Sequence, residues 1–300
     1  MKDDQASLTA LAVLQGLLYT ARHSQHKHLV SDNVVMAAEN ILQASKAGKK
    51  RLQQLDSALF RWLAPKIEAL LMPGITLHYA LRKRFIEDAT RNAIEKEGIT
   101  QVINLGAGFD ALAWCLHKEH PEVNFIEIDH PATNALKAQA LLKGEEKPAN
   151  LNLLAVDFSK EKLEQALTQC EYFDPSRPTW FICEGVLMYL DQADVKQVFQ
   201  SVIHLTGKDT QLIFTSVAPM QSSENNVGKL LKWYLKYASE PLNWLCEPAD
   251  ISHFVVQQNF ALTQLATTSV LQQLYARNEP IENLHKGEYI VIAHCNKDVD

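Results

Sequence analysis

The chain has 300 residues, of which 47% are hydrophobic, and its formal net charge is -6. This hydrophobic content supports a folded core and excludes disorder, and the five scattered cysteines do not form the pattern of a disulfide scaffold. The acidic balance argues against an extended nucleic-acid surface. We therefore expect a globular chain that binds no nucleic acid.

The part of the chain before Gly98 has a helical pattern, with apolar residues at three- and four-residue spacing. The apolar stretch from Leu8 to Tyr19 is too short and too interrupted to cross a bilayer. The segment Met1-Lys2-Asp3-Asp4 carries acid where a signal peptide carries base. These features predict a helical extension over residues 1–98, a cytoplasmic location and no membrane partner.

Short apolar runs begin after this extension and alternate with helical segments. The runs are residues 102–105, 123–128, 151–156, 179–183, 211–217, 261–266 and 289–293. Such alternation predicts a parallel sheet with right-handed crossovers. We expect a single domain over residues 1–300, with a cofactor-binding core at 99–217 and a helical lid with the final strands at 218–300. The aromatic residues Trp233, Tyr234, Tyr237 and Trp244 indicate either that lid or an inserted helix packed on the core.

A glycine turn follows the first predicted strand, at Gly106-Ala107-Gly108. Glycine permits a tight turn and lets a ligand approach the backbone closely. Ligands of open α/β sheets bind at the carboxyl ends of the strands, so Gly106 and Gly108 are candidate binding residues. By itself the turn does not identify the ligand.

Acidic residues follow each of the next three predicted strands. Asp129 follows the second strand, Asp157-Phe158 the third and Glu184 the fourth. A carboxylate at the end of the second strand suits a ribose, because it can accept hydrogen bonds from both hydroxyls of the diol. The alternative role for each acid is to cap the next helix.

Two kinds of cofactor compete for this pattern. Residues 106–111 also satisfy G-x-G-x-x-A, the fingerprint of a dinucleotide site, and so allow an NAD(P)-dependent oxidoreductase. A pyrophosphate is bound by backbone donors with few anions nearby, whereas gathered carboxylates suit a sulfonium cation that carries an ammonium group and a ribose. The acids favour the sulfonium. A further alternative is a regulatory protein that binds the cofactor without catalysis.

Four stretches of the chain form a set that covers roughly residues 75 to 190. They are Tyr79–Ile86, Val102–Asp110, Phe125–Pro131 and Glu184–Leu190. In this order they resemble the leucine carboxyl methyltransferase family and its bacterial relatives among the O-methyltransferases of polyketide biosynthesis. The segment Glu240-Pro241-Leu242 is similar more loosely. The resemblance implies a Rossmann-like class I methyltransferase sheet, mostly parallel with an antiparallel last strand, with a helical N-terminal extension and an inserted helical lid.

The resemblance also implies S-adenosylmethionine as the cofactor and a role for each matched position. Arg82 would bind the carboxylate of the methionine part, and Glu184 would lie beside the methionine moiety. Tyr189 is expected to face the acceptor side of the active site. The remaining matched positions would line the rest of the cofactor: Gly106 and Gly108 at the turn, Asp129 at the ribose, and Asp157 and Phe158 at the adenine.

Methyl transfer from a sulfonium is an in-line displacement in which the cofactor supplies the reactivity and the protein supplies alignment. A carboxylate acceptor is ionised at neutral pH and needs only positioning, whereas a hydroxyl benefits from a base. The sequence offers no obvious dedicated base, which favours a carboxylate or an acidic phenol. We expect an O-methyltransferase that uses no metal and acts on a small molecule or on a C-terminal carboxylate.

Overall fold

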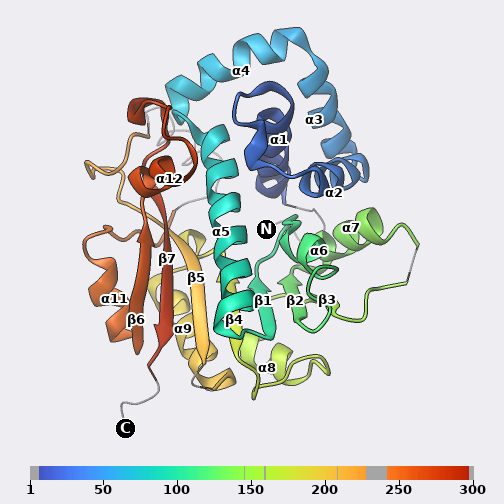
Figure 1. Ribbon diagram of the computed structural model, residues 1–300, viewed down its shortest axis with the longest axis vertical. Helices are drawn as coiled ribbons and strands as arrows, with labels where there is room; N and C mark the ends of the chain where they lie inside the picture. The colour runs from blue at the N-terminus through green and yellow to red at the C-terminus, as the bar shows by residue number, and fades with distance from the viewer. Residues whose placement is uncertain (1–6, 145, 159, 208, 228–241, 297–300) are drawn as a thin grey trace.

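The computed structural model describes residues 7–144, 146–158, 160–207, 209–227 and 242–296. These residues form one mixed sheet of seven strands with helices on both faces (Figure 1). In chain order, the strands are β1 (Gln101–Leu105), β2 (Asn124–Asp129), β3 (Leu151–Ala155), β4 (Thr179–Cys183), β5 (Thr210–Val217), β6 (Phe260–Ala266) and β7 (Glu288–Cys295). Their order across the sheet is β3-β2-β1-β4-β5-β7-β6.

Strands β1 to β5 run parallel to one another, and β7 lies antiparallel between β5 and β6. The predicted fold class, a mostly parallel Rossmann-like sheet with an antiparallel last strand, is confirmed. The strand order changes direction at β1, because β2 lies on one side of it and β4 on the other. A crevice between the carboxyl ends of β1 and β4 is therefore the expected place for a ligand.

Five α-helices precede β1 in the described part of the chain. They are α1 (Leu8–His23), α2 (Asp32–Gln43), α3 (Lys46–Asp56), α4 (Ala58–Leu71) and α5 (Ile75–Glu97). In Figure 1, α1 to α4 gather beyond one end of the sheet and α5 runs along it. The helical pattern predicted before Gly98 thus corresponds to real helices. The division of the chain into one domain with three parts stays a prediction.

The helices after β1 cover the two faces of the sheet. They are α6 (Leu112–Leu116), α7 (Pro131–Leu142), α8 (Leu163–Thr168), α9 (Gln192–Leu205), α11 (Ile251–Gln257) and α12 (Thr268–Tyr275). Side chains alternate between the faces of a strand, so β4 contributes to both cores. Trp180 and Ile182 pack in the core that includes α5, α6 and α7, and Phe181 and Cys183 pack in the core that includes α8, α9 and α11.

Helices α9 and α4 differ in their caps and in their burial. Asp191 caps α9, where its carboxylate accepts hydrogen bonds from two backbone N–H groups. The apolar spacing before Gly98 predicted helices but not their burial. Helix α4 has no buried residue, and Trp62 is 61% exposed. Ser57 caps α4 and separates it from α3.

The predicted lid is described only in part. Trp233, Tyr234 and Tyr237 lie outside the described residues, whereas Trp244 is buried in the core, where its ring contacts Phe254 of α11. The five cysteines are free, and Cys115, Cys183 and Cys295 are buried. Among the helices that the structure describes, none is both long and apolar enough to cross a membrane.

Candidate functional site

The glycine turn lies at the carboxyl end of β1, beside β2 and the segment after β4. Gly106 and Gly108 have φ angles of 66° and 52°, which favour glycine. The Ala107 N–H donates to the carbonyl of Ile128 in β2 at 3.0 Å. A Cβ on Gly106 would lie 2.5 Å from Cγ2 of Val186, so only glycine fits here without a shift. The turn therefore has a fixed shape against two neighbouring strands.

Asp129 ends β2 and holds this turn. One carboxylate oxygen accepts a hydrogen bond from the Gly108 N–H at 2.7 Å, and the other accepts from the His130 N–H at 2.8 Å. The N-cap of α7 is His130, so the capping role does not fall to Asp129. Each carboxylate oxygen has two lone pairs, and the side chain is half-buried, so Asp129 can also accept hydrogen bonds from a ligand's hydroxyls.

Asp157 and Phe158 follow β3, which pairs with β2 at the outer side of the turn. Asp157 forms an ion pair with Lys160 at 2.7 Å. Phe158 is 50% exposed. An exposed aromatic ring at the end of a strand offers a face on which a flat heterocycle can stack. In the sheet, β2 and β1 lie between β3, which these two residues follow, and β4, which Glu184 follows.

Arg82 of α5 lies between two carboxylates. Its Nε is 2.7 Å from Oε1 of Glu184, and its Nη1 is 2.5 Å from Oε2 of Glu288. The same Glu288 oxygen is 2.8 Å from Nε2 of His78, one helical turn before Arg82. Burial alone would raise the pKa of Glu288, but the charges and hydrogen bonds of Arg82 and His78 lower it well below its usual range. Glu288 is thus an ionised partner of Arg82.

Lys83, the next residue in α5, joins a third carboxylate to this cluster. Its Nζ is 2.7 Å from Oε2 of Glu184 and 3.1 Å from Oδ1 of Asp110. Asp110 also accepts hydrogen bonds from the Leu112 N–H and the Asn104 amide. Burial opposes ionisation of Asp110, yet Lys83 foremost among its partners lowers the pKa of this carboxyl below its usual value.

We call Arg82, Lys83, Asp110, Glu184 and Glu288 the charged cluster. It contains three carboxylates and two cations, so these five side chains carry one excess negative charge. Asp110 and Glu184 follow β1 and β4, where the strand order changes direction, and Glu288 begins β7 beside the carboxyl end of β5. A ligand with a net positive charge fits it better than an anion does.

Tyr189 belongs to a short 3-10 helix, Leu187–Tyr189, that follows Glu184. Its side chain is 37% exposed, and its carbonyl accepts a hydrogen bond from the Asn243 amide at 2.9 Å. The structure therefore places Tyr189 at an accessible position beyond β4, a few residues from the charged cluster.

The structure brings together two pairs of the predicted site residues, Arg82 with Glu184 and Gly108 with Asp129. Sequence reasoning did not select Lys83, Asp110, His78 or Glu288. Lys83 and Asp110 lie inside the recognised motifs, and their charges beside Arg82 and the glycine turn were an available signal. His78 lies one turn before Arg82, and Glu288 gave no local signal at all.

A metal site was not predicted. Among the residues that the structure describes, no group of three or more His, Cys, Asp or Glu side chains could hold a metal ion.

The profile of the leucine carboxyl methyltransferase family matches residues 13–203 of this chain. A Mycobacterium bovis (strain BCG / Pasteur 1173P2) protein, provisionally named an S-adenosyl-L-methionine-dependent methyltransferase, is 30% identical over 217 residues, which cover 69% of this chain and 60% of that protein. A Mycobacterium tuberculosis (strain H37Rv) protein with the same provisional name is 30% identical over 206 residues, which cover 66% of this chain and 57% of that protein. The chain thus spans about three fifths of the length of these relatives.

Solved structures resemble the fold at low sequence identity. A candidate methyltransferase of Thermobifida fusca has a TM-score of 0.56 and 16% identity, with 86% of this chain and 94% of that chain covered. Human N-acetylserotonin methyltransferase in complex with S-adenosylmethionine has a TM-score of 0.50 and 14% identity, with 98% and 74% covered. At these identities the likeness concerns the fold alone.

Proposed function

The chain belongs to the leucine carboxyl methyltransferase family, and we propose that it transfers the methyl group of S-adenosylmethionine to an oxygen atom of a small molecule or of a peptide C-terminus. The family match and the relatives named for S-adenosylmethionine support the cofactor. The charged cluster at the switch in strand order is the observation that carries the proposal in this chain.

The residues present fit this cofactor. S-adenosylmethionine carries a sulfonium, an ammonium and a carboxylate, and hence one excess positive charge, which complements the one excess negative charge of the charged cluster. Gly106 presents bare backbone where a Cβ would strike Val186, so no side chain obstructs the turn. A dinucleotide has a negatively charged pyrophosphate, and the three carboxylates disfavour it.

We assign the parts of the cofactor to residues as follows. The Arg82 guanidinium has five N–H donors, so its two carboxylate partners leave capacity for the methionine carboxylate. Glu184 binds the methionine ammonium, and Asp129 accepts hydrogen bonds from the ribose hydroxyls. The other contacts are Gly106 and Gly108 at the turn and Asp157 and Phe158 at the adenine.

Bound in this way, the cofactor supplies a methyl group on a sulfonium, ready for displacement. The protein's part is to hold the acceptor oxygen in line with that methyl group. We place the acceptor on the side of Tyr189, which follows β4 and is accessible. We propose a carboxylate or an acidic phenol as the acceptor, because either is readily ionised and needs little help from a base. The resemblance to O-methyltransferases of polyketide biosynthesis makes a polyketide one acceptor that we propose to test.

Cofactor binding is the first test, measured by calorimetry with purified protein. We expect Asp129→Ala and Glu184→Ala to weaken S-adenosylmethionine binding about tenfold or more, since each removes a charged hydrogen-bond acceptor. Asp194→Ala, on the exposed face of α9, is the matched control and should bind as the unaltered protein does. Unchanged binding in folded Asp129→Ala and Glu184→Ala proteins would contradict the site assignment.

Two further measurements separate the alternatives. S-adenosylhomocysteine should protect against thermal unfolding, and better protection by NAD or NADP would support the oxidoreductase instead. Transfer of labelled methyl groups from the donor into a cell extract should yield a labelled product. Release of labelled methanol at alkaline pH would identify a methyl ester and hence a carboxylate acceptor, whereas an alkali-stable product would identify a hydroxyl. Cofactor binding without any labelled product would favour the regulatory protein.

A further inference from the structure

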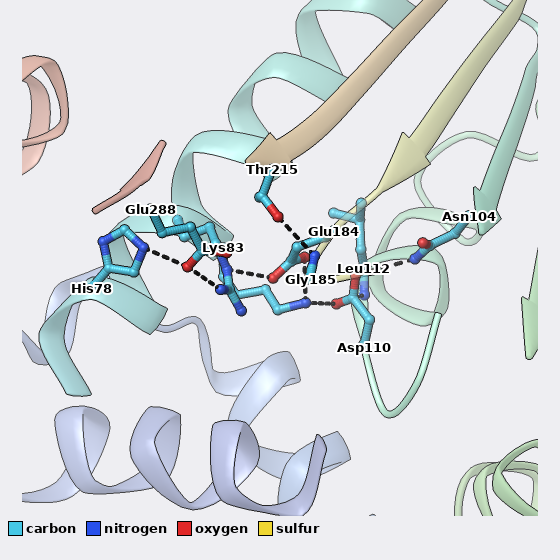
Figure 2. A network of polar contacts seen from close by, with 10 residues as sticks. His78, Lys83, Asn104, Asp110, Leu112, Glu184, Gly185, Thr215 and Glu288 are labelled. Carbon is cyan, nitrogen blue, oxygen red and sulfur yellow. Dashed lines mark hydrogen bonds and ion pairs between the residues drawn. The ribbon is translucent and has the colours of Figure 1, made fainter. Parts of the chain in front are cut away.

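Lys83 forms ion pairs with two carboxylates on opposite sides of the proposed cofactor site, Asp110 and Glu184. Asp110 follows the glycine turn after β1, and Glu184 follows β4, so the two carboxylates come from different strand ends. The Lys83 Nζ lies between them, 3.1 Å from Asp110 and 2.7 Å from Glu184 (Figure 2). Without a cation at this position, Asp110 would lose this ion pair, and Glu184 would keep Arg82 but lose its second cationic partner.

Both carboxylate oxygens of Glu184 already have cationic partners. Oε1 is paired with Nε of Arg82, and Oε2 is paired with Nζ of Lys83. A third cation that approaches Glu184 must therefore share an oxygen with one of these partners or replace it. The proposed function brings such a cation, because the methionine part of the cofactor ends in an ammonium group.

Of the two cations paired with Glu184, Lys83 is the one that an incoming cation can displace. The Arg82 side chain is 7% exposed and is also held by Glu288 at 2.5 Å. The Lys83 side chain is 20% exposed, and its ammonium sits on a flexible four-carbon stem. Its departure would break ion pairs to two buried carboxylates, which an incoming ammonium would restore. Departure of Arg82 would also break the buried pair with Glu288, which that ammonium would not restore.

We propose that Lys83 is the counterion that the cofactor's ammonium group replaces at Glu184 and Asp110, and that Lys83 thereby limits the affinity for the cofactor. This inference rests on the proposed function. One ammonium takes the place of another, so the two carboxylates stay neutralised with and without cofactor. Lys83 keeps the empty site folded and competes with the ligand for the same oxygens.

The charge state of Lys83 is consistent with this exchange. Burial by itself lowers the pKa of its ammonium, but the neighbouring charges of Asp110 and Glu184 outweigh burial and raise the pKa above its usual value. Lys83 is therefore a cation at neutral pH.

Three ligands that share the adenosine part test the proposal. S-adenosylmethionine and S-adenosylhomocysteine carry the ammonium, and 5′-methylthioadenosine lacks both the ammonium and the carboxylate. We expect Lys83→Met to bind the first two about fivefold more tightly, the factor that corresponds to loss of a partly exposed competing ion pair, and to bind methylthioadenosine with unchanged affinity. Calorimetry on the intact chain measures all three.

Matched variants isolate the charge at this position. Lys83→Arg retains a cation and should not tighten binding. Lys96→Met removes an exposed charge from the same helix and should leave all three affinities unchanged. Lys83→Gln replaces Lys83→Met if the latter does not fold, with the same expectation.

The outcomes distinguish this inference from the proposed function. Weaker binding of S-adenosylmethionine by Lys83→Met would show that Lys83 holds the methionine carboxylate, and equal changes for all three ligands would show a general structural role; either result overturns the inference and leaves the function intact. If the unaltered protein binds none of the three ligands, the proposed function falls and the inference falls with it.

Discussion

The guanidinium of Arg82 in α5 contacts the carboxylate of Glu288 in β7 at 2.5 Å, across a separation of 206 residues. Both side chains are buried. Helix α5 precedes the sheet, and β7 is the last strand to enter it. The contact therefore fixes the most sequence-distant part of the sheet to the helix that carries Arg82 and Lys83.

Replacing Glu288 should destabilise the protein. Glu288→Gln leaves the buried guanidinium of Arg82 with Glu184 as its remaining carboxylate, and loss of one partner from a buried ion pair removes about 3 kcal/mol from the free energy of unfolding. Urea denaturation at pH 7.5 measures the change. Glu282→Gln, at an exposed position six residues before Glu288 in the chain, is the control and should change stability little. Equal effects of the two variants would contradict a structural role for the Arg82–Glu288 pair.

His285 should make the protein less stable as the pH falls. Burial, reinforced by the nearby His78, lowers the pKa of His285 from 6.5 to about 3. Below about pH 6.5, His285 therefore binds a proton in the unfolded chain but stays neutral in the folded chain. The free energy of unfolding is highest above that pH and decreases as the pH falls toward 3. His285→Gln should shrink the loss between pH 7.5 and pH 5 by up to about 2 kcal/mol.

The measurement for His285 is urea denaturation at several pH values in that range. His204, which is exposed at the end of α9, supplies the control variant His204→Gln, whose pH dependence should match that of the unaltered protein. A slope that stays the same in His285→Gln would show that His285 takes up its proton in the folded state.

The two glycines of the turn should differ in their response to alanine. Both have positive φ, so Gly106→Ala and Gly108→Ala each introduce backbone strain of about 1 kcal/mol. At Gly108 the nearest atom to the new Cβ is 3.5 Å away, whereas at Gly106 it is Cγ2 of Val186 at 2.5 Å. Gly106→Ala should therefore lower the melting temperature further than Gly108→Ala does. In a Val186→Ala background the difference should shrink, and if it persists the clash with Val186 is not its cause.

The fold was largely predictable because each element has a local signal. The run 179–183 is β4, and Asp191 is the N-cap that precedes α9. Both signals depend on a few neighbouring residues: apolar runs bounded by polar ones, and a short acid before an amphipathic helix. The burial of α4 was not predictable in this way, because burial depends on what other parts of the chain lie against a helix.

The part of the candidate site that follows the parallel strands was predictable. The alternation of strands and helices predicts that the residues after β1, β2, β3 and β4 lie together at one end of the sheet, because parallel strands have their carboxyl ends on the same side. Glu288 was missed because the predicted last strand, residues 289–293, began one residue after it, whereas β7 begins at Glu288 itself. A buried carboxylate at a strand end has no apolar signature, and only its distant partner Arg82 explains its presence.

The place of β7 in the sheet has a consequence for synthesis on the ribosome. Domains fold as units while the chain emerges from its N-terminus. Strand β6 pairs with β7 and not with β5, so it has no place in the sheet until the last strand has emerged. Glu288 leaves the ribosome with that strand, and until then the nascent Arg82 has Glu184 but not its second carboxylate. The sheet and the charged cluster are thus completed in the same step, when β7 has emerged and brings Glu288 to Arg82.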